Sequence, residues 1–188
     1  MSIGAFALAL WIAIGLDQGL APVFRVGQAG IEPSFVLPLI VFVGLFATAR
    51  SASAAALVAG LCIDLLSPVT LPNGTIGVLP GPHALGMLLA MQLVLGARGL
   101  VFLNSPVTLV VLTPLAGAVA QIVATSIFAV RELYDPIGFA ASSELGRRVL
   151  SALLSAGSAI IVWLMVMPTM RWFKFEAPHV GRWAARRA

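Results

Sequence analysis

The sequence has few charged residues and a single cysteine, and each shortage excludes a class of protein. Charged side chains make up 10% of the 188 residues, against about 25% in soluble globular domains. A soluble fold of this length would have too few polar side chains to cover its surface. Cys62 stands alone, so the chain cannot form an intrachain disulfide or a thiolate metal site. Disorder is also excluded, because 60% of the residues are hydrophobic.

Sequence motifs for catalysis are missing as well. The chain contains no H-E-x-x-H, G-x-S-x-G or P-loop pattern. It has no cluster of Cys and His and no close pair of acids within an apolar run. We therefore expect a protein that is not an enzyme and that holds no cofactor or metal ion. The net charge of +4 arises largely in the C-terminal tail, which favours contact with the lipid bilayer and not with nucleic acid.

What the chain does have is a series of apolar runs, bounded by charges or by Pro and Gly. A helix that crosses the bilayer needs about 20 residues. The runs predict an all-α membrane protein with about six transmembrane helices, near residues 3–20, 34–49, 53–66, 81–97, 105–130 and 145–167. Together they form one polytopic domain, 1–170, followed by a basic-aromatic tail, 171–188. We expect the second and third helices to form a hairpin that turns at 50–53, with the 14-residue third helix short, tilted or re-entrant.

The distribution of Lys and Arg predicts the orientation. Six spans place both termini on one side of the membrane. Seven of the eleven cations then lie on that side: Arg50, Arg98, Arg171, Lys174, Arg182, Arg186 and Arg187. The other four lie on the opposite side: Arg25, Arg131, Arg147 and Arg148. The positive-inside rule therefore predicts that both termini are cytoplasmic.

Four polar residues within or beside the apolar runs are candidates for a functional or structural role. Asp64 ends the third run. It is either an acid at the membrane interface or a buried group that anchors a partner or pairs with an arginine. His83 opens the fourth run, where it packs against a loop or contacts a partner. Gln92 and Gln121 lie near the middle of the fourth and fifth runs and are expected to form interhelical polar contacts.

Small residues and a basic tail suggest how the helices and the membrane meet. Small side chains recur every four residues and allow close helix packing; they are Ala5, Ala9 and Ala13, then Ala52, Ala56 and Gly60, then Ala116, Ala120 and Ala124. Aromatic and basic side chains in the tail suit a membrane-surface anchor. That anchor comprises Arg171, Trp172, Lys174, Arg182, Trp183, Arg186 and Arg187.

One stretch resembles a known family. The segment G-L-C-I-D-L-L-S-P at 60–68, followed by P-H-A-L-G at 82–86, is similar to the rod shape-determining protein MreD family, in which a G-L-x-x-D-L-L-S motif closes one span. The residues that carry the resemblance, and that it implies form a partner interface, are Gly60, Asp64, Leu65, Ser67, Pro68 and His83. The pair Arg147-Arg148 is not part of the family pattern.

The resemblance implies a non-catalytic scaffold subunit of the bacterial cell-elongation (rod) complex. Such a protein is a multi-pass protein of the bacterial cytoplasmic (inner) membrane and helps to maintain cell shape. MreC is the expected direct partner. The resemblance further implies MreB, a RodA-type glycosyltransferase and a class B penicillin-binding transpeptidase as members of the same complex, which links the protein to peptidoglycan synthesis.

A second function stays open at this stage. Vitamin-binding membrane subunits of energy-coupling-factor transporters are similar in length and span number, and the MreD family is thought to share their architecture. Those subunits dock their membrane partner through an Ala-x-x-x-Ala face, which Ala5, Ala9 and Ala13 could supply. The expected external loops have few aromatic side chains to hold a ligand, which favours the scaffold.

Overall fold

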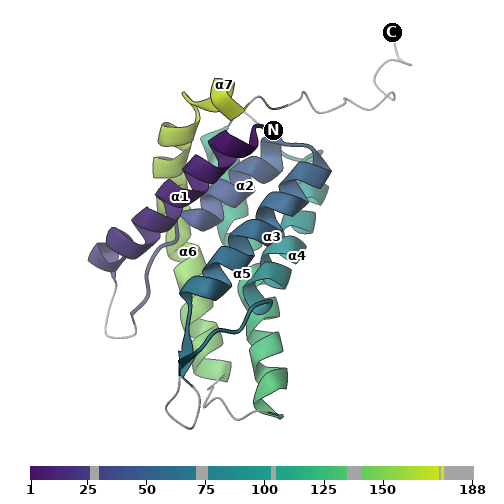
Figure 1. Ribbon diagram of the computed structural model, residues 1–188. Helices are drawn as coiled ribbons and strands as arrows, with labels where there is room; N and C mark the ends of the chain where they lie inside the picture. The colour runs from purple at the N-terminus through teal and green to yellow at the C-terminus, as the bar shows by residue number, and fades with distance from the viewer. Residues whose placement is uncertain (26–29, 71–75, 103–104, 135–140, 174, 176–188) are drawn as a thin grey trace.

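The computed structural model describes residues 1–25, 30–70, 76–102, 105–134, 141–173 and 175, and this part of the chain is nearly all helical (Figure 1). Its elements are α1 (Ile3–Gly19), the 3-10 helix η1 (Ala21–Phe24), α2 (Val36–Phe46), α3 (Ala49–Leu66), β1 (Val69–Thr70), β2 (Ile76–Gly77), α4 (Pro82–Ala97), α5 (Pro106–Glu132), α6 (Ala141–Val166) and α7 (Met170–Phe173). The two-residue strands pair antiparallel and form a small hairpin between α3 and α4.

Three helices in the described chain are long and apolar enough to cross a membrane. They are Ala49–Leu66, Pro106–Glu132 and the Glu144–Val166 part of α6. Three further apolar helices, α1, α2 and α4, are shorter than 18 residues. The all-helical fold and the long apolar helices define the chain as a membrane protein.

The six longer helices run in alternating directions, so the bundle has two distinct ends (Figure 1). The N-terminus and α7 meet at one of them, where the backbone N–H of Ser2 donates to the carbonyl of Phe173 at 2.7 Å. We call this the terminal end. At the other, the distal end, α3 stops and α4 begins, and α5 stops and α6 begins (Figure 1). The described start and finish of the chain therefore lie together.

Helix α2 lies at the centre of the bundle. It contacts α1, α3, α4, α5 and α6, and every residue from Val36 to Leu45 is buried. Its 11 residues reach about 16 Å at 1.5 Å per residue, which is about half the hydrocarbon thickness. The prediction of a span at 34–49 is therefore too long. A helix is apolar on all sides either when it faces lipid or when protein surrounds it. Protein surrounds α2, and this explains its apolar run.

Helix α3 starts earlier than the sequence pattern indicated. Thr48 caps it, since its side-chain oxygen accepts the backbone N–H of Ser51 at 3.4 Å. The α2–α3 turn consequently lies at Ala47–Thr48, and the prediction of a turn at 50–53 is wrong. The predicted 14-residue helix at 53–66 is in fact 18 residues long. A threonine cap has no hydropathy signal, so an apolar run locates such a boundary only to within several residues.

Two glycines allow α4 to pack closely on its neighbours. A Cβ atom on Gly60 of α3 would overlap the backbone of His83 and Ala84 in α4. A Cβ atom on Gly86 of α4 would overlap the carbonyl oxygen of Ala120 in α5. Helices α3, α4 and α5 thus approach until backbones touch, which is the packing that small residues permit in membranes.

The sixth helix and the region after it also differ from expectation. Helix α6 begins at Ala141, four residues before the predicted start. After it, α7 forms a short helix where only a tail was expected, and Phe173 is buried. The ring of Phe175 stacks on Phe173 and lies 6.2 Å and 6.1 Å from the rings of Phe42 and Phe46. The beginning of the tail therefore packs onto the bundle.

Candidate functional site

A buried carboxylate joins the end of α3 to the start of α4. Asp64 is 1% exposed, so it does not stand in water at the helix end. Its Oδ2 accepts the backbone N–H groups of Gly81 at 2.8 Å and Ala84 at 3.2 Å, and its Oδ1 accepts that of His83 at 3.0 Å. These N–H groups belong to the first turn of α4, whose own N-cap, Gly81, has no side chain to offer. Asp64 therefore caps a helix that begins 18 residues later.

His83 extends this contact to α6. Its Nδ1 lies 2.8 Å from Asp64 Oδ1, and its Nε2 lies 3.1 Å from Nη1 of Arg148. A guanidinium can only donate and a carboxylate can only accept. The imidazole hydrogen is therefore on Nδ1, and Nε2 accepts from Arg148. The ring also meets Phe128 edge-on, with 5.9 Å between the ring centroids.

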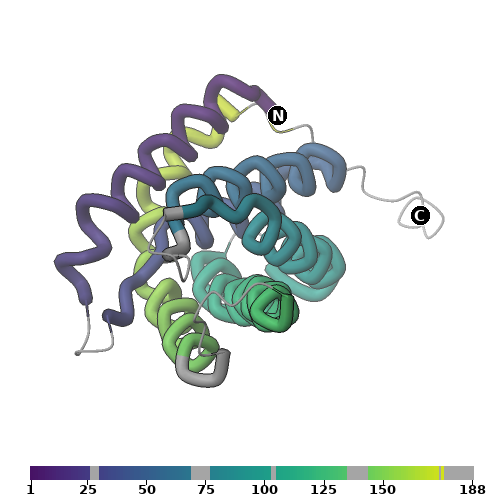
Figure 2. The backbone as a smooth tube through the Cα atoms, turned by 60° about the horizontal axis from the view of Figure 1, so that its bottom comes forward, coloured from purple at the N-terminus to yellow at the C-terminus, as the bar shows by residue number. Residues whose placement is uncertain are grey.

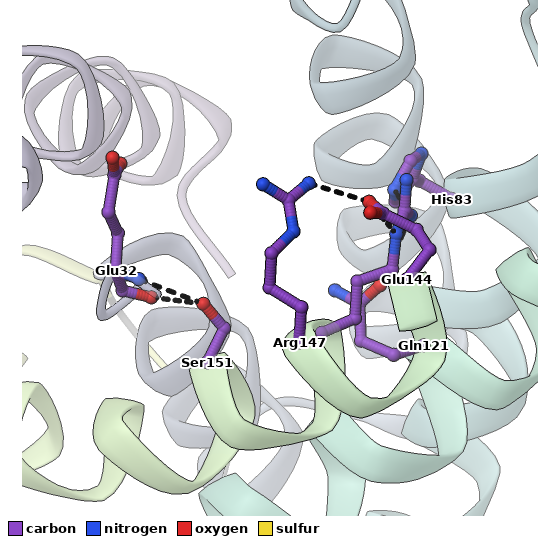
Figure 3. Close-up of polar contacts among 7 residues, drawn as sticks. Glu32, His83, Gln121, Glu144, Arg147 and Ser151 are labelled. Atoms are coloured by element: carbon purple, nitrogen blue, oxygen red, sulfur yellow. Dashed lines mark hydrogen bonds and ion pairs between the residues drawn. The ribbon is translucent and has the colours of Figure 1, made fainter. Parts of the chain in front are cut away.

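Arg148 connects α4, α5 and α6 through one guanidinium. Besides His83, its Nη1 lies 3.4 Å from Oε1 of Gln121, and its Nε donates to Oε1 of Glu144 at 2.9 Å. Its guanidinium carbon lies 5.4 Å from the centroid of the Phe128 ring, within cation–π range. Arg147 donates to the same Glu144 oxygen at 2.7 Å. Asp64, His83, Gln121, Glu144, Arg147 and Arg148 together form what we call the distal network. Figure 3 shows His83, Gln121, Glu144 and Arg147 of this network.

The network positions helices and is poorly arranged for proton transfer. Both nitrogens of His83 are taken, one by Asp64 and one by Arg148, so neither is free to accept a proton from a substrate. Within the described ranges, no group of three His, Cys, Asp or Glu side chains could hold a metal ion. What the geometry provides is a rigid polar connection between four helices whose surroundings are mostly apolar.

A second carboxylate performs the same capping task for the central helix. Asp17, near the end of α1, accepts the hydroxyl of Ser34 at 3.0 Å and the backbone N–H groups of Phe35 and Val36. At the opposite end of α2, Arg98 donates from Nε to the carbonyl of Gly44 at 2.5 Å and from Nη2 to that of Ala47. Partial burial lowers the pKa of the Arg98 guanidinium. Helix α2 thus has a negative group at its N-terminus and a positive one at its C-terminus, as its dipole favours.

Serines on one face of α6 hold the segment that leads into α2. Ser151 both accepts the backbone N–H of Glu32 at 3.1 Å and donates to its carbonyl (Figure 3). One turn further on, Ser155 accepts the backbone N–H of Ser34 at 2.8 Å, and Ser158 donates to the carbonyl of Ser34 at 2.5 Å. The spacing of these serines, i, i+4 and i+7, predicts one polar helix face. The sequence therefore carried a signal for this contact, although no motif marked it.

The structure brings some of the predicted site residues together and separates others. Asp64 and His83 are in direct contact, and Gln121 joins them through Arg148. Gln92 lies apart, where its amide donates to Ser53 on α3 at 3.1 Å. The remaining motif residues of the α3 end, Leu65, Ser67 and Pro68, are exposed.

The predicted membrane-surface anchor is described only in part. Arg171 and Trp172 lie on α7 with exposed side chains. The other predicted anchor residues, Lys174, Arg182, Trp183, Arg186 and Arg187, lie outside the described residues. The anchor therefore stays a prediction.

Two cavities with shared wall residues lie beside the distal network. One, of about 320 Å³, is lined by the polar groups at the start of α6 together with His83 and Gln121. The other, of about 260 Å³, runs deeper towards Asp17 and Met87. Both include His83, Gln121 and Ser151 in their walls. Asp17 thus lines the deeper cavity, and His83, which Asp64 holds, lines both.

Comparison of the chain with protein-family models, with curated proteins and with solved structures gives no match. The fold and the site define the class as an all-helical membrane protein with a buried polar network at one end of its bundle.

Proposed function

We propose that the chain is a non-catalytic scaffold of the MreD type, a subunit of the rod complex in the bacterial inner membrane. In this proposal the helices α1 to α6 make six crossings, with both termini cytoplasmic and the distal end facing outwards. The shorter α1, α2 and α4 cross as parts of a bundle and not as isolated helices. MreC is the direct partner in this proposal. The other members, MreB, the RodA-type glycosyltransferase and the class B penicillin-binding transpeptidase, belong to the same complex.

The observation that carries the proposal is the contact between the two halves of the family-like motif. G-L-C-I-D-L-L-S-P ends α3 and P-H-A-L-G begins α4. Asp64 holds the two segments together through three backbone N–H groups and the imidazole of His83. A motif whose acid fixes a helix-to-helix junction is what a scaffold requires, because its activity depends on a surface of constant shape.

The exposed motif side chains are the proposed contact with MreC. Leu65 is 62% exposed at the end of α3, beside exposed Ser67 and Pro68. We expect Leu65→Ala to reduce co-purification of MreC and to round the cells while membrane levels stay normal. Leu89→Ala is the matched control, since Leu89 is 50% exposed in mid-α4. Equal MreC recovery with both variants would refute the proposed interface.

The vitamin-binding alternative is favoured by one observation, the deeper cavity of about 260 Å³ that all six helices α1 to α6 line. A ligand that binds only the native state stabilises it by RT ln(1 + L/Kd), where L is the free ligand concentration, so the unfolding temperature rises with ligand concentration. A thermal-unfolding screen of the purified protein with vitamins therefore distinguishes the two functions. Stabilisation by a vitamin at micromolar concentration, together with neighbouring genes for a transporter ATPase, would replace the scaffold proposal.

A further inference from the structure

The wider cavity at the distal end has the size and the chemistry of a small binding site. Its volume is about 320 Å³, at the lower limit of the roughly 300–1,000 Å³ usual for ligand pockets. It is lined by the segment before α2, the end of α3, the start of α4, Gln121 within α5 and the first turns of α6. The deeper cavity shares His83, Gln121 and Ser151 with it, so further space for a ligand larger than a simple ion lies directly beside it.

The cavity wall contains two arginines, Arg147 and Arg148, and two acids, Glu32 and Glu144. Both arginines donate to the carboxylate of Glu144. The other acid in the wall, Glu32, is already paired with Arg25. The side chains of Arg147 and Arg148 are 45% and 20% exposed. Their guanidinium groups are therefore partly shielded from water, and their attraction for an anion is stronger than at an open surface.

Hydrogen-bond donors point into the same space from two helices. Arg147 donates from Nη2 to Glu144. Its guanidinium lies between the Glu32–Ser151 contact and the carboxylate of Glu144 (Figure 3). Its Nε and Nη1 make no hydrogen bond to any residue that the structure describes. Gln121 uses its carbonyl oxygen towards Arg148, and its amide NH2 has no partner within those same residues. A planar guanidinium fork beside an amide donor suits an oxyanion with several acceptor oxygens.

We propose that this cavity binds a phosphate group, with Arg147 and Gln121 as its donors and Arg148 as the neighbouring positive charge. The phosphate is carried either by a lipid headgroup or by a soluble molecule, since the cavity lies at the end of the bundle, where both can reach it. The inference does not depend on the scaffold function. The two proposals can fail separately. Thermal unfolding with phosphate compounds tests the binding site, whereas MreC co-purification and cell shape test the scaffold.

Thermal unfolding of the full-length protein in a maltoside detergent tests the proposal. The probes are glycerol phosphate, short-chain phosphatidic acid and, as the lipid without phosphate, short-chain diacylglycerol, all at equal ionic strength. We expect a saturable rise in the unfolding temperature with one or both phosphate compounds and none with diacylglycerol. A response to phosphatidic acid alone identifies a lipid headgroup as the source, and a response to glycerol phosphate identifies a soluble one.

Arg147→Gln is the decisive variant, because Arg148 still neutralises Glu144 when Arg147 is gone. We expect it to weaken phosphate binding about tenfold or more, since a charged fork donor is lost. Arg50→Gln, at the exposed start of α3 on the terminal end, is the matched control and should bind as the native protein does. Should Arg147→Gln fail to fold, Arg147→Lys, which keeps the charge and loses the fork, replaces it and should weaken binding. No saturable response to either phosphate compound, or equal responses with and without the Arg147 guanidinium, would overturn the inference.

Discussion

At the residue scale, the structure depends on two aspartates that each cap a helix from a distance. Asp17 accepts N–H groups at the start of α2, and Asp64 accepts N–H groups at the start of α4. Helix N-termini inside a bilayer cannot rely on water for their N–H groups. A buried carboxylate supplies the acceptors and also complements the positive end of the helix dipole.

Replacing Asp64 with asparagine should be among the most destabilising single changes. The amide would keep one acceptor oxygen but would point an NH2 group at backbone N–H donors. We expect a loss of about 2–4 kcal/mol in the free energy of unfolding. Reversible unfolding in mixed detergent micelles measures it.

Gln92→Ala is the comparison for that substitution. It removes an exposed interhelical hydrogen bond to Ser53, and such bonds contribute about 0.6 kcal/mol on average in membrane proteins. Similar losses in the two variants would contradict the central position of Asp64 in the network.

At the element scale, α2 shows how a short buried helix is tolerated. Ten of its residues are buried, and its terminal groups are satisfied by Asp17 at one end and Arg98 at the other. The neighbouring helices are joined by direct backbone contact at Gly60 and Gly86. Polar capping and close packing together replace the length that the helix lacks.

Loss of the Arg98 contact should destabilise the terminal end of α2. In Arg98→Met the carbonyls of Gly44 and Ala47 lose their donors, and we expect a loss of about 1–2 kcal/mol. Arg50→Met, an exposed arginine near the same end, should change stability by less than about 0.5 kcal/mol. The same micelle unfolding assay compares them, and equal losses would argue that Arg98 is only a surface charge.

Two glycines on α4 offer a matched steric test. An alanine methyl at Gly86 would overlap the Ala120 carbonyl, whereas nothing lies within 4 Å of the Cβ position at Gly96. Gly86→Ala should therefore destabilise the protein by about 1–3 kcal/mol through overpacking. Gly96→Ala should be neutral or stabilising by up to about 1 kcal/mol, because alanine is the better helix former. Melting temperatures that fall equally would contradict the close approach of α4 and α5.

At the scale of the whole molecule, the alternating helices place the chain ends at one end of the bundle and the polar network at the other (Figures 1 and 2). Helix α1 lies along the outside, and the tube view in Figure 2 shows it separated from α5 by the rest of the bundle. The proposed orientation, with the network outside, assigns the two ends to the two sides of the membrane.

Cysteine labelling in intact cells tests that orientation. In a Cys62→Ser background, Tyr134→Cys places a thiol at the distal end and Leu100→Cys at the terminal end, where the native side chains are 85% and 87% exposed. A membrane-impermeant maleimide should label the first and spare the second until the cells are opened. Labelling of Leu100→Cys in intact cells would reverse or exclude the proposed topology.

The sequence by itself determined the class of the protein and the approximate location of its helices. Apolar runs at 105–130 and 145–167 correspond to α5 and α6. Of the small residues in α3, Ala52 and Ala56 are buried and Gly60 lies against the backbone of α4. These features depend on composition and on local periodicity, which a single segment carries within itself.

The tertiary structure alone decided what the polar residues do and which apolar helix is enclosed by protein. Asp64 contacts His83, and His83 in turn contacts Arg148, only because α3, α4 and α6 converge at the distal end. Hydropathy does not distinguish a helix surrounded by lipid from α2, which is surrounded by protein, because both environments are apolar. Contacts between residues 18 to 65 positions apart depend on how whole helices pack, and no local pattern in the chain encodes that packing.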